Sequence, residues 1–311
     1  MSAHSIEVLE APPPDAVELQ ALLDAAHRSD DHQPLGEQKR LALRGKGPFL
    51  ALLLRGPTPD GPDTLVGLAL LAPASDGFGL EVVVHPAHRA THLLGGDDPR
   101  RLLVAGARRE VQRRGGGILR YWVAQATPED DAAARSLGFD PERELLQLRV
   151  DLPIAATDEL GALPVRAFVP GIDEAAWLAV NARAFADHPE QGAWDEATLA
   201  ARESEAWFDP TGFLIAEEDG RIIGSCWTKV HRDGASVVGE IYVISVDPRS
   251  QRRGLGRRLT VAGLDWLARA GAQTGMLYVD AANGAAVALY RSLGFRVDHA
   301  DRSYVARLEP R

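Results

Sequence analysis

The stretch SVDPRSQRRGLGRRLT, Ser245–Thr260, combines five arginines with two glycines in a chain that is acidic as a whole. Guanidinium groups are forked donors that bind phosphate and carboxylate oxygens. Gly254 and Gly256 carry no Cβ, so a ligand can approach the backbone closely at both positions. The stretch is therefore a candidate binding site for a phosphate-bearing ligand. Its arginines are Arg249, Arg252, Arg253, Arg257 and Arg258.

The neighbouring residues predict a strand before the glycines and a helix after them. The apolar run VVGEIYVISV ends at Val246, and a helix is expected over 252–270. The first turn of a helix has unpaired N–H groups at the positive end of its dipole, which favours phosphate. A solvated basic helix face is the alternative. Leu259 excludes a dinucleotide fingerprint, because a third glycine belongs there, and the absence of a lysine excludes a P-loop.

The same order of predicted elements occurs twice along the chain. In each half a hairpin and a third strand precede a helix, a strand, a second helix and a last strand. The sequence SLGF stands in both halves, at 136–139 and 292–295. We therefore expect an internal duplication with an α/β fold, in which each copy is a mixed, mostly antiparallel sheet flanked by helices. The predicted domains are 1–152 and 165–311, joined by a linker at 153–164.

Length and composition restrict the class of protein. The 311 residues suit two domains. Because 44 acidic residues outnumber 34 basic ones, the net charge of −10 argues against a general nucleic-acid binder and a polybasic membrane surface. Without a signal peptide or a membrane span, the chain is expected to be cytoplasmic, and we expect a monomer. The single cysteine, Cys226, is expected to be a core thiol rather than a nucleophile.

The stretch at Gln251–Gly256, QRRGLG, resembles a motif of the GCN5-related N-acetyltransferases, the GNAT family. It fits the pattern [QR]xxGx[GA], whose loop in that family holds the pyrophosphate of acetyl-CoA. The segment NGAAVALYRSLGF at 283–295 resembles the second motif of the family. The resemblance covers most of 165–308 and implies acetyl-CoA as co-substrate. The residues it assigns to acetyl-CoA are Ile244, Ser245, Val246, Gln251, Arg252, Arg253, Gly254, Leu255, Gly256, Arg257 and Asn283.

Four further stretches resemble those of the tandem-domain mycothiol synthases within that family. They are GEQ at 36–38, HPEQG at 188–192, WTKVH at 227–231 and GEIYV at 239–243. These enzymes acetylate the cysteinyl amine of desacetylmycothiol, Cys-GlcN-Ins, in the last step of mycothiol biosynthesis. Taken singly, each side chain concerned could be a solvated surface group. The contacts to this thiol-sugar acceptor that the resemblance implies are Glu37, Glu190, Lys229, Glu240 and Tyr278.

Glu240 is the candidate general base that the resemblance implies. It lies in a predicted strand, and a strand-end charge without a catalytic role is the alternative. An α-amine titrates near pH 8, so roughly a tenth of it is neutral at pH 7, and a carboxylate acting through a water could remove the remaining proton. The alternating side chains expected on the same face as Glu240 are Tyr242, Ile244 and Val246.

Tyr290 is the candidate general acid. It follows Asn283 by two helical turns, so both are expected on the same side of a helix. The resemblance implies that Tyr290 protonates the leaving CoA thiolate, and a buried core tyrosine is the alternative. No Ser-His-Asp or Cys-His arrangement suggests a covalent intermediate, so direct transfer in a ternary complex is expected. His188 and His231 have no metal-ligand spacing, and no metal is predicted.

The first half departs from the motifs of the second. Its loop at 86–98, PAHRATHLLGGDD, lacks the glycine spacing and ends in two aspartates, and Ala134 stands where the second half has Tyr290. We therefore expect one active site, in residues 165–308, with the first half supplying structure and Glu37. Two other functions remain open from the residues alone. One is acetylation of another amine, such as an aminoglycoside or a protein N-terminus, and the other is an acyl-CoA sensor without turnover.

Overall fold

The computed structural model describes residues 4–13, 16–30, 32–58, 61–74, 76–89, 98–155, 163–186, 191–232, 236–250 and 254–311. The chain forms two compact units. The first contains Met1–Glu144 together with Ala300–Arg311, and the second contains Leu145–His299. Among the described helices, none is long and apolar enough to cross a membrane.

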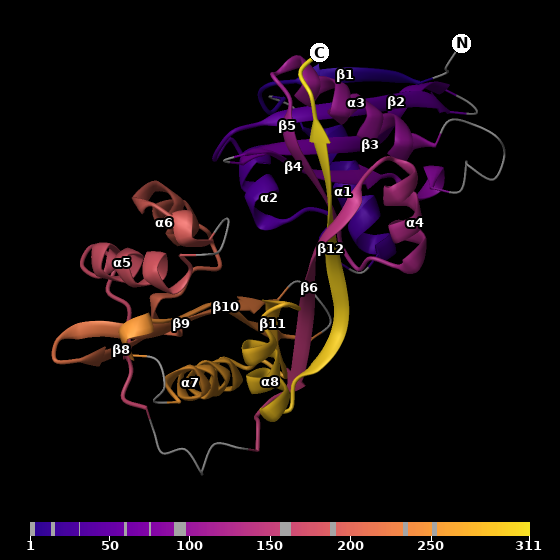
Figure 1. Ribbon diagram of the computed structural model, residues 1–311. Helices are drawn as coiled ribbons and strands as arrows, with labels where there is room; N and C mark the ends of the chain where they lie inside the picture. The colour runs from indigo at the N-terminus through magenta and orange to yellow at the C-terminus, as the bar shows by residue number, and fades with distance from the viewer. Residues whose placement is uncertain are drawn as a thin grey trace. The chain divides into compact units, whose positions relative to one another are not determined.

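The first unit is a sheet with helices on both faces (Figure 1). Its strand order is β1-β2-β3-β4-β5-β12, and only the β4–β5 pair is parallel. Alternate residues of its central strands pack against α3 on one face and against α1 and α2 on the other. The elements are β1 (Ser5–Leu9), α1 (Val17–Asp30), α2 (Glu37–Leu43), β2 (Leu50–Thr58), β3 (Gly61–Ala74), β4 (Gly77–Val84), α3 (Pro99–Arg113), β5 (Gly117–Val123) and α4 (Pro128–Ser136).

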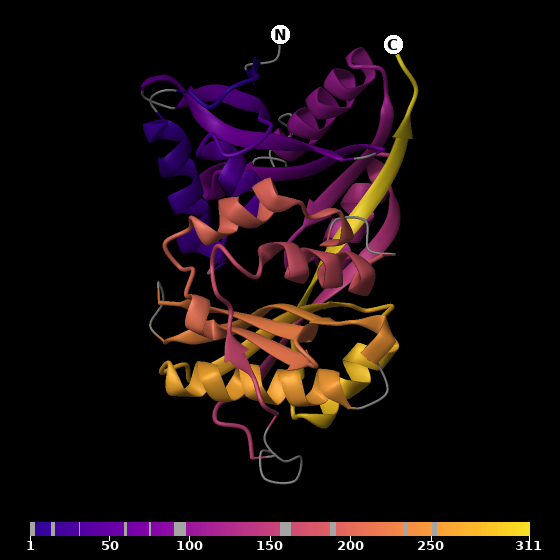
Figure 2. The ribbon, with the colours of Figure 1, turned by 90° about the vertical axis from the view of Figure 1, so that its left-hand side faces the viewer.

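The second unit has a sheet of the same kind, with the order β6-β11-β10-β9-β8-β7. Figure 2 shows α5 and α6 on one face of this sheet and α7 on the other. Each face has its own apolar core, so the strands between them are buried on both sides. The elements are β7 (Arg166–Ala167), α5 (Glu174–Ala184), α6 (Glu196–Glu203), β8 (Phe213–Glu218), β9 (Arg221–His231), β10 (Val238–Val246), α7 (Leu255–Arg269), β11 (Thr274–Asp280) and α8 (Gly284–Ser292).

Two long strands are each divided between the units. The end of β6 (Asp140–Asp151) pairs with β11 in the second unit, and the end of β12 (Arg296–Leu308) pairs with β5 in the first. Tyr304 of β12 is fully buried in the core of the first unit. The compact units thus have other boundaries than the predicted domains, because each sheet takes one strand from the other half of the chain: β12 joins the first unit and β6 joins the second.

The last two helices of each half repeat with one offset. Helices α3 and α7 both have 15 residues, and α4 and α8 both have nine. Helix α3 starts at Pro99 and α7 at Leu255, an offset of 156 residues that α4 and α8 share. A hydrogen bond recurs as well, from Arg101 to Ser136 in the first unit and from Arg257 to Ser292 in the second. These matches support the predicted duplication.

Candidate active site

Strand β10 contains a β-bulge next to Glu240. Its register with β9 shifts between Ile241 and Val243, which inserts one extra residue. Ile241 packs on the α7 side of the sheet, whereas Tyr242 and Val243 both pack on the α5 and α6 side. Ile244 then packs on the α7 side again. The expected alternation from Glu240 onward is therefore wrong beyond Tyr242, and Val246, like Ile244, lies against the α7 core.

The same part of β10 lies beyond the ladder with β11. That parallel pairing runs from Val238 to Ile241, whereas the antiparallel pairing with β9 continues to Val246. Backbone groups on the β11 side of the last residues of β10 can therefore pair with an extended ligand, as a strand edge does. The last residues of β10 include Ile244, Ser245 and Val246, which are predicted to bind acetyl-CoA. The buried Ser245 is held by a 2.9 Å hydrogen bond to Ser225.

Two predicted acceptor contacts meet on the α5 and α6 side of the sheet. Glu240 is paired directly opposite Lys229 of β9, and each residue is 8% exposed. The Lys229 ammonium lies 4.2 Å from the ring centre of Trp207 and 5.3 Å from that of Tyr242. Cation–π attraction offsets part of the cost of burying this charge. The site thus presents a carboxylate and an ammonium beside an aromatic wall.

The N-terminus of α7 offers an anion site. Its N-cap, Gly254, has φ 65° and ψ 16°, a left-handed conformation that glycine adopts without strain. Among the described residues no side chain caps this helix end, so its first N–H groups are left for a ligand or water. A Cβ on Gly254 would meet nothing within 4 Å, and one on Gly256 would lie 3.9 Å from Val246. No described atom therefore blocks the approach of a ligand to the backbone at either glycine.

Asp247 holds the turn that leads from β10 to α7. Its Oδ1 accepts the backbone N–H of Arg249 at 3.0 Å, and its Oδ2 accepts a 2.6 Å bond from Arg183 of α5. The hydrogen bond from Arg183 is the main reason that the pKa of Asp247 lies below its usual value. Since Asp247 is buried, its charge depends on this partner. The ion pair therefore positions the start of the predicted cofactor loop.

Helix α8 carries both predicted residues of the second motif. Asn283 is the exposed N-cap, and its Oδ1 accepts the backbone N–H of Ala286 at 3.1 Å. Tyr290 is 7% exposed, with its ring edge-on to Phe295 at 5.7 Å. Burial raises the pKa of the Tyr290 hydroxyl, and Cys226 adds to the effect. The hydroxyl is therefore protonated at neutral pH, as a general acid must be.

Three more predicted site residues are held by neighbours in the second unit. Tyr278 is 40% exposed, and its hydroxyl accepts a 2.7 Å bond from Gln147. Arg257 donates to Ser292 at 2.6 Å. Leu255 is buried, so only its backbone can reach a ligand. Since the bond of Arg257 recurs in the first unit, it belongs to the fold as well as to the predicted site.

The remaining predictions lie elsewhere or outside the described residues. Glu37 is the first residue of α2, in the first unit. Cys226 is fully buried, and burial raises the pKa of its thiol to about 12, which supports a core role. In the described ranges no three His, Cys, Asp or Glu side chains could hold a metal. The predicted site residues outside those ranges are Glu190, Gln251, Arg252 and Arg253.

Comparisons with known proteins place the chain among acetyltransferases. The acetyltransferase (GNAT) family model matches residues 177–295. A mycothiol acetyltransferase from Thermobispora bispora is 44% identical over 295 residues, 93% of this chain and 95% of that protein. Another, from Streptomyces avermitilis, is 43% identical over 315 residues, 97% of this chain and 96% of that protein. The chain belongs to the mycothiol acetyltransferase family.

The family assignment confirms several predictions from the sequence. Mycothiol acetyltransferases are acyltransferases of the GNAT class, and this class uses acetyl-CoA. The family implies a small-molecule substrate. A tandem GNAT protein from the clavulanic acid biosynthesis pathway matches the structure with a TM-score of 0.71 at 16% identity, over 99% of this chain and 100% of that one. Its likeness supports the predicted fold of two tandem GNAT domains.

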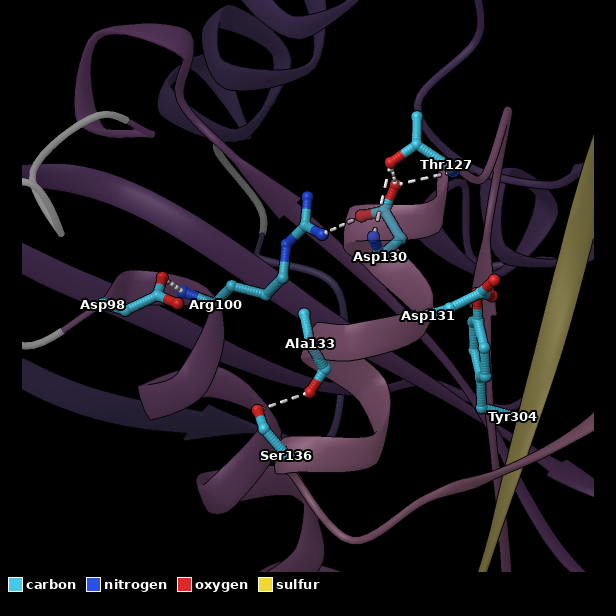
Figure 3. A network of polar contacts seen from close by, with 8 residues as sticks. All are labelled: Asp98, Arg100, Thr127, Asp130, Asp131, Ala133, Ser136 and Tyr304. Carbon is cyan, nitrogen blue, oxygen red and sulfur yellow. Dashed lines mark hydrogen bonds and ion pairs between the residues drawn. The ribbon is translucent and has the colours of Figure 1, made fainter.

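The first unit closes the N-terminal end of α3 with a side chain, as Figure 3 shows, whereas the corresponding end of α7 has no side-chain cap among the described residues. Asp98 caps α3 by accepting the N–H of Arg100 at 2.9 Å, where the 156-residue offset places Gly254 in the second unit. The Arg100 guanidinium bonds Asp130 of α4 at 2.6 Å. Thr127 and Asp130 form a capping box at the start of α4. Asp98 thus satisfies an N–H group of α3 that a bound phosphate would otherwise use, whereas the capped start of α4 has a counterpart in the second unit, where Asn283 caps α8.

Sequence reasoning missed one partner of the candidate base. His231 is the last residue of the WTKVH stretch, and its Nε2 lies 2.7 Å from Glu240 Oε2. Only the register of the β9–β10 hairpin reveals it, because pairing Lys229 with Glu240 places His231 diagonally beside Glu240. The residues of the two strands alone do not determine that register, so the contact could not be predicted from them.

Proposed function

We propose that the chain transfers the acetyl group of acetyl-CoA to the cysteinyl amine of Cys-GlcN-Ins, directly and in a ternary complex. The observation that carries the proposal is the arrangement of Glu240 and Lys229 beside the open end of β10 in a member of this family. A carboxylate and an ammonium suit an acceptor that offers an amine and several hydroxyl groups. Glu37, Glu190 and Tyr278 are further acceptor contacts in this proposal.

Glu240 is the general base of the proposed reaction. The neutral amine attacks the thioester carbonyl carbon, and its nitrogen must then lose a proton to give the amide. Glu240 takes this proton through a water. Glu240 is buried, with 8% of its surface exposed, and this step needs no covalent intermediate.

Tyr290 is the general acid. As the C–S bond breaks, the CoA thiolate takes the Tyr290 proton and leaves as the thiol. A tyrosine hydroxyl is protonated at neutral pH, so Tyr290 has a proton to donate when the thiolate forms. Glu240 then releases the amine proton to solvent and Tyr290 takes one up from solvent, so that the net change is one proton from nitrogen to sulfur.

The second unit binds acetyl-CoA in the proposal, and the first does not. The uncapped end of α7 and the glycines at its start receive the pyrophosphate, with Asn283 and the end of β10 as further contacts. The first unit has Asp98 and the Arg100–Asp130 ion pair at the corresponding place. A carboxylate at a helix N-terminus competes with a phosphate for the same N–H groups.

Acetyl-CoA and a panel of amines test this function. The panel holds Cys-GlcN-Ins, an aminoglycoside and a peptide N-terminus, with CoA release and product mass as readouts. We expect a product from Cys-GlcN-Ins alone, acetylated on nitrogen with its thiol still reactive toward a thiol reagent. Turnover of the aminoglycoside or the peptide but not of Cys-GlcN-Ins would contradict the acceptor, and acetyl-CoA binding without any turnover would indicate a sensor.

A further inference from the structure

The candidate base Glu240 is held by a histidine at the end of the neighbouring strand. The distance from His231 Nε2 to Glu240 Oε2 is 2.7 Å, and the side chains are 31% and 11% exposed. At this distance one proton must lie between the two atoms, because a carboxylate oxygen and an unprotonated ring nitrogen are both acceptors. With an ionised Glu240, the ring carries that proton on Nε2 and donates it.

The β9–β10 hairpin determines that these side chains meet. Lys229 pairs with Glu240 and His231 pairs with Val238, so His231 is the diagonal neighbour of Glu240 on the same face. The opposite face is packed tightly, since a Cβ on Gly239 would lie 2.7 Å from a methyl of Leu267. If the pairing slipped by one residue, the Glu240 side chain would point into that packed face. The packing therefore excludes the slipped register.

We propose that His231 is a positioning residue for the acetyl transfer. Its Nε2–H fixes Oε2 of Glu240, which turns Oε1 toward the acceptor and defines the path of the amine proton. Glutamate has three rotatable side-chain bonds, and a carboxylate that sampled several rotamers would be correctly placed for only part of the time. The proposal rests on the proposed function of Glu240 as the base.

Three variants at one position test whether the Nε2–H is what matters. His231→Gln places an amide NH₂ near the position of Nε2, His231→Asn is too short and reaches only that of Nδ1, and His231→Ala removes the donor. We expect kcat with Cys-GlcN-Ins to fall by about 10-fold to 100-fold in the Asn and Ala variants, the scale of a misplaced reacting group. The Gln variant should recover most of the loss. The KM for acetyl-CoA should stay within about 2-fold in all three, because its site lies at α7.

The outcomes separate positioning from a structural role. Equal losses in the Gln and Asn variants, or a wild-type kcat in the Ala variant, would overturn the proposal. If all three variants bind acetyl-CoA as the wild type does, unfolding is not the cause of any loss. A double variant with Glu240→Ala should be no slower than Glu240→Ala alone, since His231 acts only through that carboxylate.

A measurement without turnover keeps this inference separate from the proposed function. Nitrogen NMR of histidine-labelled protein identifies His231 among the nine histidines by the signal lost in His231→Gln. We expect its Nε2 to be protonated in the wild type and the ring signals to shift in Glu240→Ala. An unprotonated Nε2, or signals unchanged by Glu240→Ala, would refute the contact. Failure of the protein to acetylate Cys-GlcN-Ins would refute the proposed function and leave this result standing.

Discussion

Glu240→Ala and Tyr290→Phe should each lower kcat by about 10²-fold or more, the usual contribution of one general base or acid. Alanine at 240 removes the proton acceptor, and phenylalanine at 290 removes the hydroxyl while keeping the ring against Phe295. Acetyl-CoA affinity should change little, because the predicted anion site is at α7. Steady-state kinetics with varied acetyl-CoA and Cys-GlcN-Ins measure both effects.

Matched controls show whether the effects are specific. Tyr121→Phe removes the hydroxyl of another buried tyrosine, in the first unit, and Glu217→Ala removes a carboxylate of β8 that pairs with Arg166. Both controls should leave kcat within about 2-fold, since neither residue belongs to the proposed site. Near-wild-type turnover in Glu240→Ala and Tyr290→Phe would remove these residues from the mechanism.

Gly254→Asp should weaken acetyl-CoA binding by at least about 10²-fold. The new carboxylate would cap α7 as Asp98 caps α3, and it would stand where the pyrophosphate binds. Like charges about 4 Å apart repel by roughly 1 kcal/mol in water and about 4 kcal/mol near a protein surface. Each 1.4 kcal/mol is about tenfold in affinity, so the larger value alone accounts for the loss. Equilibrium binding of acetyl-CoA measures it.

Gly271→Asp is the control for backbone strain. Gly271 follows the other end of α7, has φ 90°, and a Cβ there would also meet nothing within 4 Å. An aspartate at either glycine costs about 1–2 kcal/mol for the left-handed conformation. We expect Gly271→Asp to lower stability similarly and to leave acetyl-CoA affinity unchanged. Equal affinity losses in the two variants would mean that strain, and not charge at the binding site, is the cause.

The glycine-bearing start of α7 and the repeated helices could be predicted, because the glycine spacing and the recurring SLGF sequence are visible in the chain itself. The QRRGLG spacing places two glycines at the start of a helix, and the structure has α7 beginning at Leu255 with an open end. Helix α1 could also have been predicted, because Leu19, Leu22 and Ala26 have helical spacing and form its buried face.

The bulge and the divided strands could not be read from the residues. Around Tyr242 the strand is buried on both faces, so the apolar run has no alternation whose interruption would reveal an extra residue. Strands β6 and β12 each look like one continuous element, and nothing in their local pattern shows where they pass from one unit to the other. The contact of His231 with Glu240 depends on a hairpin register, which is a pairing rather than a motif.

Calorimetric titration of the intact chain with acetyl-CoA tests most directly whether the second unit alone binds the co-substrate. The open end of α7 and the self-capped end of α3, with its Arg100–Asp130 ion pair, predict one tight site per chain. Two sites of comparable affinity in the wild-type chain would contradict this assignment.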